Sequence, residues 1–287
     1  DDSRGEYIYK FVSAARWDPR DAHATDRLAV GDKYLDQGTL YVAKFKEDGS
    51  GEWLELSMRN PIVAANPDFE FKSDADIAIF TRLAADAVGA TRMDRPEWGG
   101  VNPKNGEVYF TLTNNSNRGK EGYDDVNAAN PIVENATGHI IRWAEAGNDH
   151  TATSFDWDIF VFAGEQGTET VVEGEAVVTL DDTNIFNSPD GLWFDYNGRL
   201  WIQTDGSDAA PYQNNMMLAA NPVTREIKRF FVGPQGCEVT GVVSTPDVKT
   251  MFVNIQHPDG HWPNASEDRP RDATVIVTRD DGGVVGA

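Results

Sequence analysis

Three acidic residues stand at matching places in the chain, each just before a segment that we expect to form a β-strand. Glu97 lies in "EWGGV" and Glu238 in "EVTGV", which share the spacing E-x-x-G-V, and Asp190 directly precedes the Gly of "SPDGLW". Carboxylates that meet in one place repel strongly unless a multivalent cation lies among them. Oxygen ligands of this kind suit Ca²⁺ or Mg²⁺, and Fe or Mn if other ligands join. The pattern therefore predicts a metal site, with hydrated acids that cap strand ends as the alternative.

Polar residues follow the next strand of each of these segments. They are Asn114 and Asn115 in "TLTNNS", Thr204 and Asp205 in "IQTDG", and Gln256 and His257 in "NIQHP". In an antiparallel hairpin the second strand returns to the start of the first, so we expect these side chains near the acids. Ordinary turn formation is the alternative for this group.

Arg95 stands two residues before Glu97, with Pro96 stiffening the link between them. A guanidinium beside a metal-bound carboxylate makes an anion site of the size of a phosphate, because Arg can hold two oxygens at once. A surface salt bridge is the alternative for this pair. Cys237, next to Glu238, could bind metal as a thiolate or pack as a small buried hydrophobe.

A repeated pattern of strands must position these residues. Three segments read as β-hairpins: "EWGGVNPKNGEVYFTLTNN", "PDGLWFDYNGRLWIQTDG" and "EVTGVVSTPDVKTMFVNIQHP". Two further strands follow each of the first two hairpins, and one follows the third, so the unit has four strands. Units of roughly 45 to 50 residues with recurring aromatics predict the blades of a β-propeller. A β-sandwich is the alternative.

The N-terminal region supplies three strands, "EYIYKFV", "GTLYVAKF" and "GEWLEL", which resemble a blade without its innermost strand. The all-β chain therefore covers roughly three and a half four-stranded blades, fewer than the four at which propellers close. We expect the C-terminal portion of a larger propeller, with a distorted four-bladed ring as the alternative. We expect one domain over residues 1–287, with a helical insertion at 74–90 that places Ile77, Phe80, Leu83 and Ala87 on one face, and a short helix over 124–130. The long loop 115–137 is expected to be functional or disordered.

Composition excludes several classes of function. The 287 residues include 25 basic and 47 acidic side chains, a net charge of −22, so nucleic acid and anionic membranes would be repelled. We find no apolar run of about 18 residues and no basic segment followed by an apolar core at the start. The chain begins without Met, so we expect a processed or trimmed product. P-loop, G-x-S-x-G and H-E-x-x-H motifs are absent.

Several long motifs resemble the C-terminal half of the PhoX alkaline phosphatases. They include "MDRPEWGGVNPKNGEVYFTLTNNS", "SPDGLWFDYNGRLWIQTDG", "GPQGCEVTGVVSTPDVKTMFVNIQHP" and "RPRDATVIVTRDDGGVVGA". The resemblance implies a six-bladed propeller, exported to the periplasm or beyond by the twin-arginine route. It also implies phosphomonoester hydrolysis with a calcium and iron cofactor, in the service of phosphate acquisition.

The resemblance assigns roles to particular residues. Arg95 would bind phosphate, and Glu97 would ligate metal in the catalytic centre. Beside the resemblance, the position of Asn114 at the end of its strand makes it a further candidate for binding substrate. Asp190, Asp205 and Glu238 would complete the metal ligands found here. The iron-bound cysteine and another glutamate of the family come from the earlier half of the propeller, and Cys237 is not that cysteine. We therefore expect the missing N-terminal part, or another copy, as a partner that completes the site.

Two other functions remain open at this point. A calcium-dependent lactonase or diesterase propeller would also place acids and Asn around one Ca²⁺, and a metal-binding propeller fragment would need no catalysis. Arg95 separates the first of these from a phosphatase, because phosphate recognition uses a guanidinium and lactone opening does not.

Overall fold

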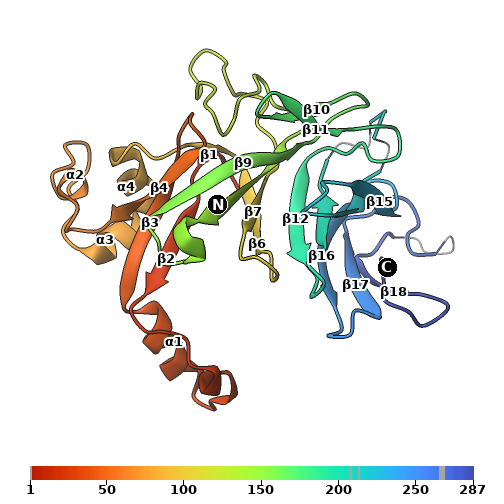
Figure 1. The fold of residues 1–287 in the computed structure, drawn as a ribbon, viewed down its shortest axis with the longest axis horizontal. Helices are drawn as coiled ribbons and strands as arrows, with labels where there is room; N and C mark the ends of the chain where they lie inside the picture. The colour runs from red at the N-terminus through yellow and green to blue at the C-terminus, as the bar shows by residue number, and fades with distance from the viewer. Residues whose placement is uncertain (1, 207–208, 213, 265–268) are drawn as a thin grey trace. The chain divides into compact units, whose positions relative to one another are not determined.

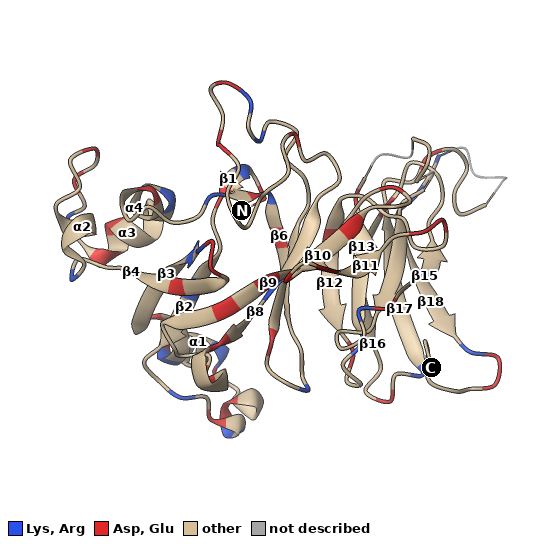
Figure 2. Ribbon diagram, turned by 45° about the horizontal axis from the view of Figure 1, so that its top comes forward, with Lys and Arg blue, Asp and Glu red and all other residues tan. Residues whose placement is uncertain are grey.

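The computed structural model describes residues 2–206, 209–212, 214–264 and 269–287 of the chain, which form two compact units (Figure 1). The first unit contains the N-terminal residues up to Gly5, Met93–Ala144 and Trp157–Ala287. The second contains Glu6–Arg92 and Glu145–Asp156. Within the described residues no helix is long and apolar enough to cross a membrane. Acidic residues are spread over strands and loops of both units (Figure 2).

The first unit is built from successive antiparallel sheets. The first sheet contains β6 (Pro96–Val101), β7 (Val108–Leu112), β8 (His139–Glu145) and β9 (Ser154–Phe162). These four belong to a seven-stranded sheet whose other three strands come from the second unit, in which β9 begins. The next contains β12 (Pro189–Phe194), β13 (Leu200–Thr204), β14 (Met216–Ala220) and β15 (Ile227–Val232), and the third β16 (Glu238–Ser244), β17 (Thr250–Gln256) and β18 (Ala273–Thr278). Smaller pairs are β1 (Arg4–Glu6) with β5 (Met93–Asp94), and β10 (Glu169–Val172) with β11 (Glu175–Thr179). The first strands lie side by side, with β12 between β6 and β16.

The sheet of β12 to β15 is buried on both faces. Successive side chains of a strand point to opposite sides, so Leu200 and Ile202 enter a core shared with Tyr109 and Phe160 of the first sheet. Trp201 enters the opposite core, which contains Val239 of the third sheet. All of β13 is therefore buried, which explains why its first three residues, "LWI", are all apolar where a one-sided strand would alternate.

The second unit packs short helices against a sheet. Its strands are β2 (Tyr9–Ser13), β3 (Gly38–Phe45), β4 (Ser50–Leu56) and the first residues of β9, and its helices are α1 (Arg27–Leu35), α2 (Pro61–Ala64), α3 (Asp74–Ile79) and α4 (Thr81–Ala87). This unit also contains short 3-10 helices at Pro19–His23 and Ala146–Asn148. Val42 and Leu56 of the sheet meet Ile77, Ala84 and Ala85 of the helices in a buried cluster.

The predicted all-β fold is confirmed, and the strands predicted for each blade occur in the expected order. The single domain over 1–287 stays a prediction. The helical segment 74–90 was predicted as one helix, but it breaks at Phe80, whose φ of −108° and ψ of 42° leave the α-region. Because the helix axis changes direction at the break, the residues predicted to share one apolar face do not all face the core. Phe80 is 42% exposed, and Ala84 and Ala85 are buried in place of Leu83. Residues 124–130 were wrongly predicted as helical; Asn127 and Asn130 bridge a turn there.

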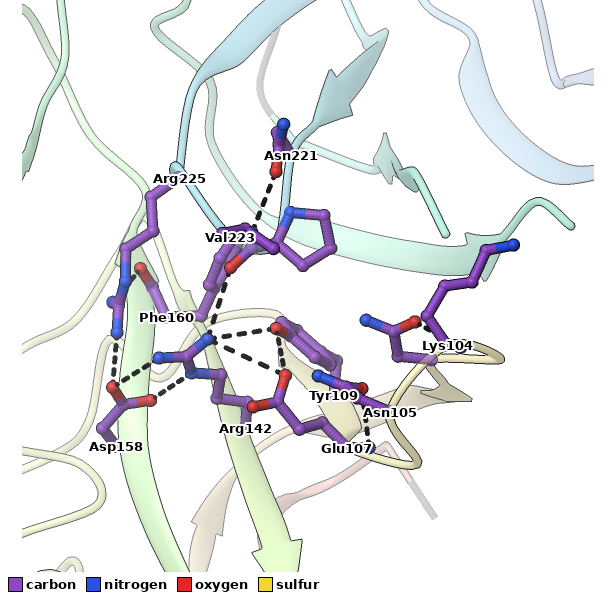
Figure 3. A network of polar contacts seen from close by, with 12 residues as sticks. Lys104, Asn105, Glu107, Tyr109, Arg142, Asp158, Phe160, Asn221, Val223 and Arg225 are labelled. Carbon is purple, nitrogen blue, oxygen red and sulfur yellow. Dashed lines mark hydrogen bonds and ion pairs between the residues drawn. The ribbon is translucent and has the colours of Figure 1, made fainter. Parts of the chain in front are cut away.

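A cluster of charged residues joins the first two sheets of the first unit (Figure 3). Asp158 on β9 binds Arg142 of β8 in a two-pronged ion pair, with Nε–Oδ1 at 2.7 Å and Nη2–Oδ2 at 3.1 Å. Arg225, from the turn between β14 and β15, also pairs with Asp158 and donates to the carbonyl oxygen of Phe160 at 2.9 Å. Both guanidinium groups lie over the Phe160 ring. The Asp158 carboxylate thus pairs with arginines from two neighbouring sheets, and Glu107 lies 3.9 Å from Arg142 as a second negative charge.

Replacing Asp158 with Asn keeps the shape of the side chain and removes the charge that the two arginines share. We expect the free energy of unfolding to fall by about 2 to 3 kcal/mol, less than for a fully buried pair, because the Asp158 side chain is 25% exposed. Urea denaturation followed by tryptophan fluorescence measures this loss. Asp281→Asn, which breaks the exposed pair with Arg279, is the control and should change it by less than about 0.5 kcal/mol. Equal losses in the two variants would contradict the role given to Asp158.

Candidate functional site

The starts of β6 and β12 share an unusual backbone. Arg95 has a φ of 53° and Ser188 a φ of 47°, and each is followed by a proline and then an acid. The Arg95 carbonyl oxygen accepts from the Thr113 amide at 3.0 Å, and that of Ser188 accepts from the Asp205 amide at 3.1 Å. A positive φ in a residue other than Gly is strained and persists only where the surroundings enforce it. The same hydrogen bond enforces it in both strands.

A β-bulge then carries the acid in each of these strands. On β6, Pro96 pairs with Leu112 and Gly99 with Phe110, so Glu97 and its neighbour Trp98 oppose one residue. On β12 the register shifts in the same way between Pro189 and Leu192, which places Asp190 in the bulge. Bulges redirect side chains at functional sites. This repeated bulge explains how two acids from neighbouring sheets are turned out of the strand pleat.

Glu238 is positioned differently, although its sequence spacing matches that of Glu97. It is the first residue of β16 and pairs with Gln256, whose Nε2 donates to Glu238 Oε2 at 3.1 Å. The bulge of β16 lies further along the strand, at Gly241 with a φ of 51°. The shared E-x-x-G-V spacing therefore does not correspond to one position in the sheet.

The predicted carboxylates lie close enough to raise one another's pKa values. Burial first, and then the negative charges of Glu238 and Asp205, together raise the pKa of Asp190 to about 7. Burial also raises the pKa of Glu97 to about 7, helped by Asp190 and Asp2. The pKa values of Asp205 and Glu238 are raised too, by burial first and, for Glu238, then by Asp205. The four acids therefore resist ionisation together.

Two threonines of the first sheet fix Asp190. Thr113 Oγ1 donates to Asp190 Oδ1 at 3.3 Å, and Thr111 Oγ1 donates to the Asp190 carbonyl oxygen at 2.7 Å. Both threonines are fully buried. They flank Leu112 at the end of β7. Because side chains of an extended chain alternate between two faces, the pattern "TLT" could have shown that both threonines face the same side.

One oxygen of this set of acids is buried and unsatisfied. Among the described residues, Glu97 Oε2 is a buried carboxylate oxygen without a hydrogen-bond partner. Leaving such an atom unsatisfied is costly, and a bound cation would relieve both this cost and the mutual repulsion of the acids. In the part of the chain that the structure describes, no group of three His, Cys, Asp or Glu side chains is arranged to hold a metal ion. The acids fit a cation as an open set of oxygen donors.

Arg95 already binds an oxyanion. Its Nη2 donates to Asp2 Oδ2 at 2.8 Å and its Nε to the Asp2 carbonyl oxygen at 2.9 Å. These hydrogen bonds hold the pKa of the Asp2 carboxyl below its usual range. The Arg95 side chain remains 23% exposed. Sequence reasoning missed Asp2, because nothing in the sequence connects a residue near the N-terminus with a strand 93 positions later.

The remaining candidates have mixed surroundings. Asn114 is half-buried, and its Nδ2 donates to Ser188 Oγ at 3.3 Å, which places it at the start of β12. Asp205 follows β13 and lies within electrostatic reach of Arg95. Cys237 is 1% exposed and packs in a core with Val239. Cys237 is therefore better described as a small buried hydrophobic residue than as a metal-binding thiolate.

Comparison with known proteins identifies a match over most of the chain. The family model "Alkaline phosphatase PhoX" matches residues 1–259. The structure of Pseudomonas fluorescens PhoX in complex with vanadate, a transition state analogue, is similar with a TM-score of 0.88 and 46% identity. This match covers 100% of the chain and 51% of the Pseudomonas chain, so the chain spans about half of that relative. None of the curated proteins matches the chain.

Two other structures are similar only at a low level. A gluconolactonase from Xanthomonas campestris shares 12% identity with a TM-score of 0.31, over 66% of this chain and 59% of its own. An endo-1,5-alpha-L-arabinanase from Thermotoga petrophila shares 12% identity with a TM-score of 0.28, over 76% of this chain and 46% of its own. Scores this low support no conclusion about fold or function.

The raised pKa values predict how pH affects the metal-free chain. A carboxyl whose folded pKa exceeds its unfolded value, about 4, stabilises the fold at low pH and loses this contribution as pH rises through the folded value, about 7 for Glu97 and Asp190. We therefore expect the Tm measured in the presence of a chelator to fall between pH 5.5 and pH 8 by at least about 2 °C. This shift corresponds to a loss of about 1 kcal/mol in the free energy of unfolding. Differential scanning calorimetry measures it.

A double variant, Glu97→Gln with Asp190→Asn, is the control for all other titrating groups. Its Tm should depend less on pH than that of the unmodified chain, because the two amides do not titrate. Added Ca²⁺ should raise the Tm of the unmodified chain at pH 8 and leave that of the double variant nearly unchanged. The same pH dependence in both proteins would show that these carboxyls do not control it.

Proposed function

Because the chain belongs to the alkaline phosphatase PhoX family, we propose that it takes part in metal-dependent hydrolysis of phosphomonoesters with release of inorganic phosphate. The observation that carries this proposal is the position of Arg95. Its guanidinium binds the Asp2 carboxylate and lies within electrostatic reach of Asp190 and Asp205. A cationic fork beside a set of acids that fits a cation is suited to a phosphate group, whose oxygens would satisfy both.

We assign the acids to the metals. Glu97, Asp190, Asp205 and Glu238 would hold the ions, which we propose to be calcium together with iron. When bound, the metals would supply positive charge that stabilises the phosphoryl group in the transition state. Iron would need ligands in addition to these four residues.

The other residues of the site would bind and orient the ester. Arg95 would exchange the Asp2 carboxylate for two phosphate oxygens, because the carboxylate and the phosphate compete for the same donors. Asn114 offers an amide donor next to Ser188. Thr113 and Thr111 hold Asp190 in place, so its carboxylate would not need to reorganise when substrate binds.

The rest of the site would come from beyond this chain. The chain spans about half of Pseudomonas fluorescens PhoX. We propose that the remaining part of a longer protein, or another copy, supplies the additional iron ligands, a cysteine and a glutamate. We further propose that the protein acts in the periplasm or outside the cell, where phosphate esters are released for uptake. Activity should accordingly be measured on the metal-loaded protein that contains this chain.

Arg95→Ala tests phosphate recognition. We expect kcat/KM for a phosphomonoester to fall by about 100-fold or more, because a donor aimed at the transferring group is lost. Arg95→Lys should recover only a small part, since an ammonium cannot bind two oxygens as a fork. Arg279→Ala, which removes an exposed guanidinium, is the matched control. Retained phosphatase activity in Arg95→Ala, or greater activity of the unmodified protein on a lactone, would refute the proposal.

Metal removal tests the assignment of the acids. A strong chelator should abolish phosphomonoesterase activity, and adding calcium and iron back should restore it. Elemental analysis of the chelated protein confirms that the metals are gone. Glu97→Gln should lower the amount of metal retained after dialysis, because a neutral amide is a weaker ligand than a carboxylate. Full activity after verified metal removal would overturn the proposed mechanism.

A further inference from the structure

A second charged cluster, which the proposed mechanism does not use, is centred on Asp94, the residue directly before Arg95. Asp94 and Arg118 are both fully buried. Arg118 Nε and Nη2 lie 2.8 and 2.7 Å from Asp94 Oδ1. A buried ion pair is stable only if its other hydrogen-bonding groups are also satisfied, because both charges have left water.

The long loop 115–137 satisfies them. Asn115 Nδ2 donates to Asp94 Oδ1 at 2.9 Å, and Asn135 Nδ2 lies 3.4 Å from Asp94 Oδ2. The Asp94 amide donates to Asn130 Oδ1 at 3.0 Å. Arg118 Nη1 donates to the carbonyl oxygen of Asp125 at 2.9 Å. The loop that was expected to be functional or disordered is thus ordered around one carboxylate.

A neutral histidine completes this cluster. Burial lowers the pKa of His139, so the ring is uncharged near neutral pH. Asn135 Nδ2 lies 3.1 Å from His139 Nδ1, which must then accept, and His139 Nε2 donates to the Ala129 carbonyl oxygen at 2.7 Å. The ring adds no further charge beside Asp94 and Arg118.

The cluster is connected to the candidate site through short lengths of backbone. Asp94 continues into Arg95, and Asn115 follows Asn114 and Thr113. The Thr113 amide donates to the Arg95 carbonyl oxygen at 3.0 Å, so the two segments that meet at Asp94 also bond to each other beside the site.

A third segment is anchored in the same cluster. Asn135 Oδ1 accepts from the Gly138 amide at 2.9 Å. The preceding residue, Thr137, accepts through its carbonyl oxygen from the Ser188 amide at 2.7 Å. Ser188 is the positive-φ residue before the bulge that carries Asp190. Asp94 is therefore the common attachment point of the segments that carry Arg95, Asn114 and Asp190.

We propose that Asp94 is a positioning residue for the phosphatase reaction, which it serves by holding these three segments in register through Arg118, Asn115 and Asn135. This inference rests on the proposed function. Reacting groups must be held to within a fraction of an ångström, and a displacement of about 1 Å can lower the rate about 100-fold. The Asp94 carboxylate needs no contact with the substrate to have this effect.

A purely stabilising role is the competing explanation, and the chain offers a matched control for it. Asp158 is also a carboxylate paired with arginine within the first unit, but its partners join the sheets at Phe160. Asp94→Asn and Asp158→Asn each remove one charge from such a pair without changing side-chain size. A stabilising role predicts that both variants affect activity only in proportion to the fraction unfolded.

The experiment measures kcat, KM and inhibition by inorganic phosphate in the metal-loaded protein, well below the Tm of each variant. We expect Asp94→Asn to lower kcat/KM by about 10- to 100-fold and to weaken phosphate inhibition, with metal content unchanged. Asp158→Asn should stay within about 2-fold of the unmodified protein. Values for Asp94→Asn within about 2-fold, or equal losses in both variants, would overturn the inference.

Hydrogen–deuterium exchange gives a readout that does not depend on activity. The Thr113 and Ser188 amides should exchange faster in Asp94→Asn than in Asp158→Asn, because their acceptors are carried by the segments that Asp94 anchors. If the unmodified protein lacks phosphatase activity, the proposed function fails, and exchange alone then decides whether Asp94 fixes these segments. Equal exchange in the two variants would refute the inference.

A milder variant covers the case in which Asp94→Asn does not fold. Asn115→Ala removes one hydrogen bond to Asp94 and leaves the ion pair with Arg118 in place. It should lower kcat/KM in the same direction by a smaller factor and accelerate exchange of the Thr113 amide. A folded Asn115→Ala variant with unchanged kinetics and exchange would refute the role of Asp94 as an anchor for this segment.

Discussion

Mutual repulsion among neighbouring carboxylates, of which Asp190 is buried, is the constraint around which the candidate site of the first unit is organised. Asp190 ionises with difficulty because protein surrounds it and because Glu238 and Asp205 are near. A flexible chain would relieve this repulsion by moving the acids apart. Here each acid lies on or directly beside a strand, and Asp190 is held in addition by two buried hydroxyl groups from the neighbouring sheet. The fold thus keeps together charges that would separate in solution, which is the condition for capturing a cation.

The surrounding sheets provide the rigidity that this arrangement requires. The second sheet of the first unit is buried on both faces, so its first strand cannot shift without disturbing two cores. Arg142 and Arg225 reach Asp158 from different sheets and fix their spacing away from the acids. Apolar packing therefore braces the strand that carries Asp190, whereas this ion pairing acts on other strands. A site built on strands braced in this way holds its geometry better than one carried by loops alone.

Local patterns in the sequence predicted much of this structure. Turn residues between alternating apolar positions identified the hairpins, because such signals depend on only a few neighbouring residues. The positions of Glu97, Asp190 and Glu238 at strand starts followed from the same hairpins. The bulges did not, since a register shift depends on which residue of the partner strand is opposite. The pairing of Asp94 with Arg118 was also missed, because the ion pair forms only when the loop folds back. The helix break at Phe80 escaped for a related reason, since the apolar spacing continued through it.

The different placement of Glu238 has a consequence for how such repeats diverge. In β16 the register shift follows Thr240, two residues after Glu238, whereas in β6 and β12 the acid lies in the bulge itself. A bulge inserts one residue and shifts the alternation of the side chains beyond it, so its position decides which face each later residue of the strand occupies. Copies of one structural repeat can therefore keep the same sequence spacing, differ in the position of the bulge, and still direct their charges toward a common neighbour. Alignment by motif alone would treat Glu97 and Glu238 as equivalent, although they occupy different positions in their sheets. Equivalent residues of such copies are better identified from the pairing of the strands.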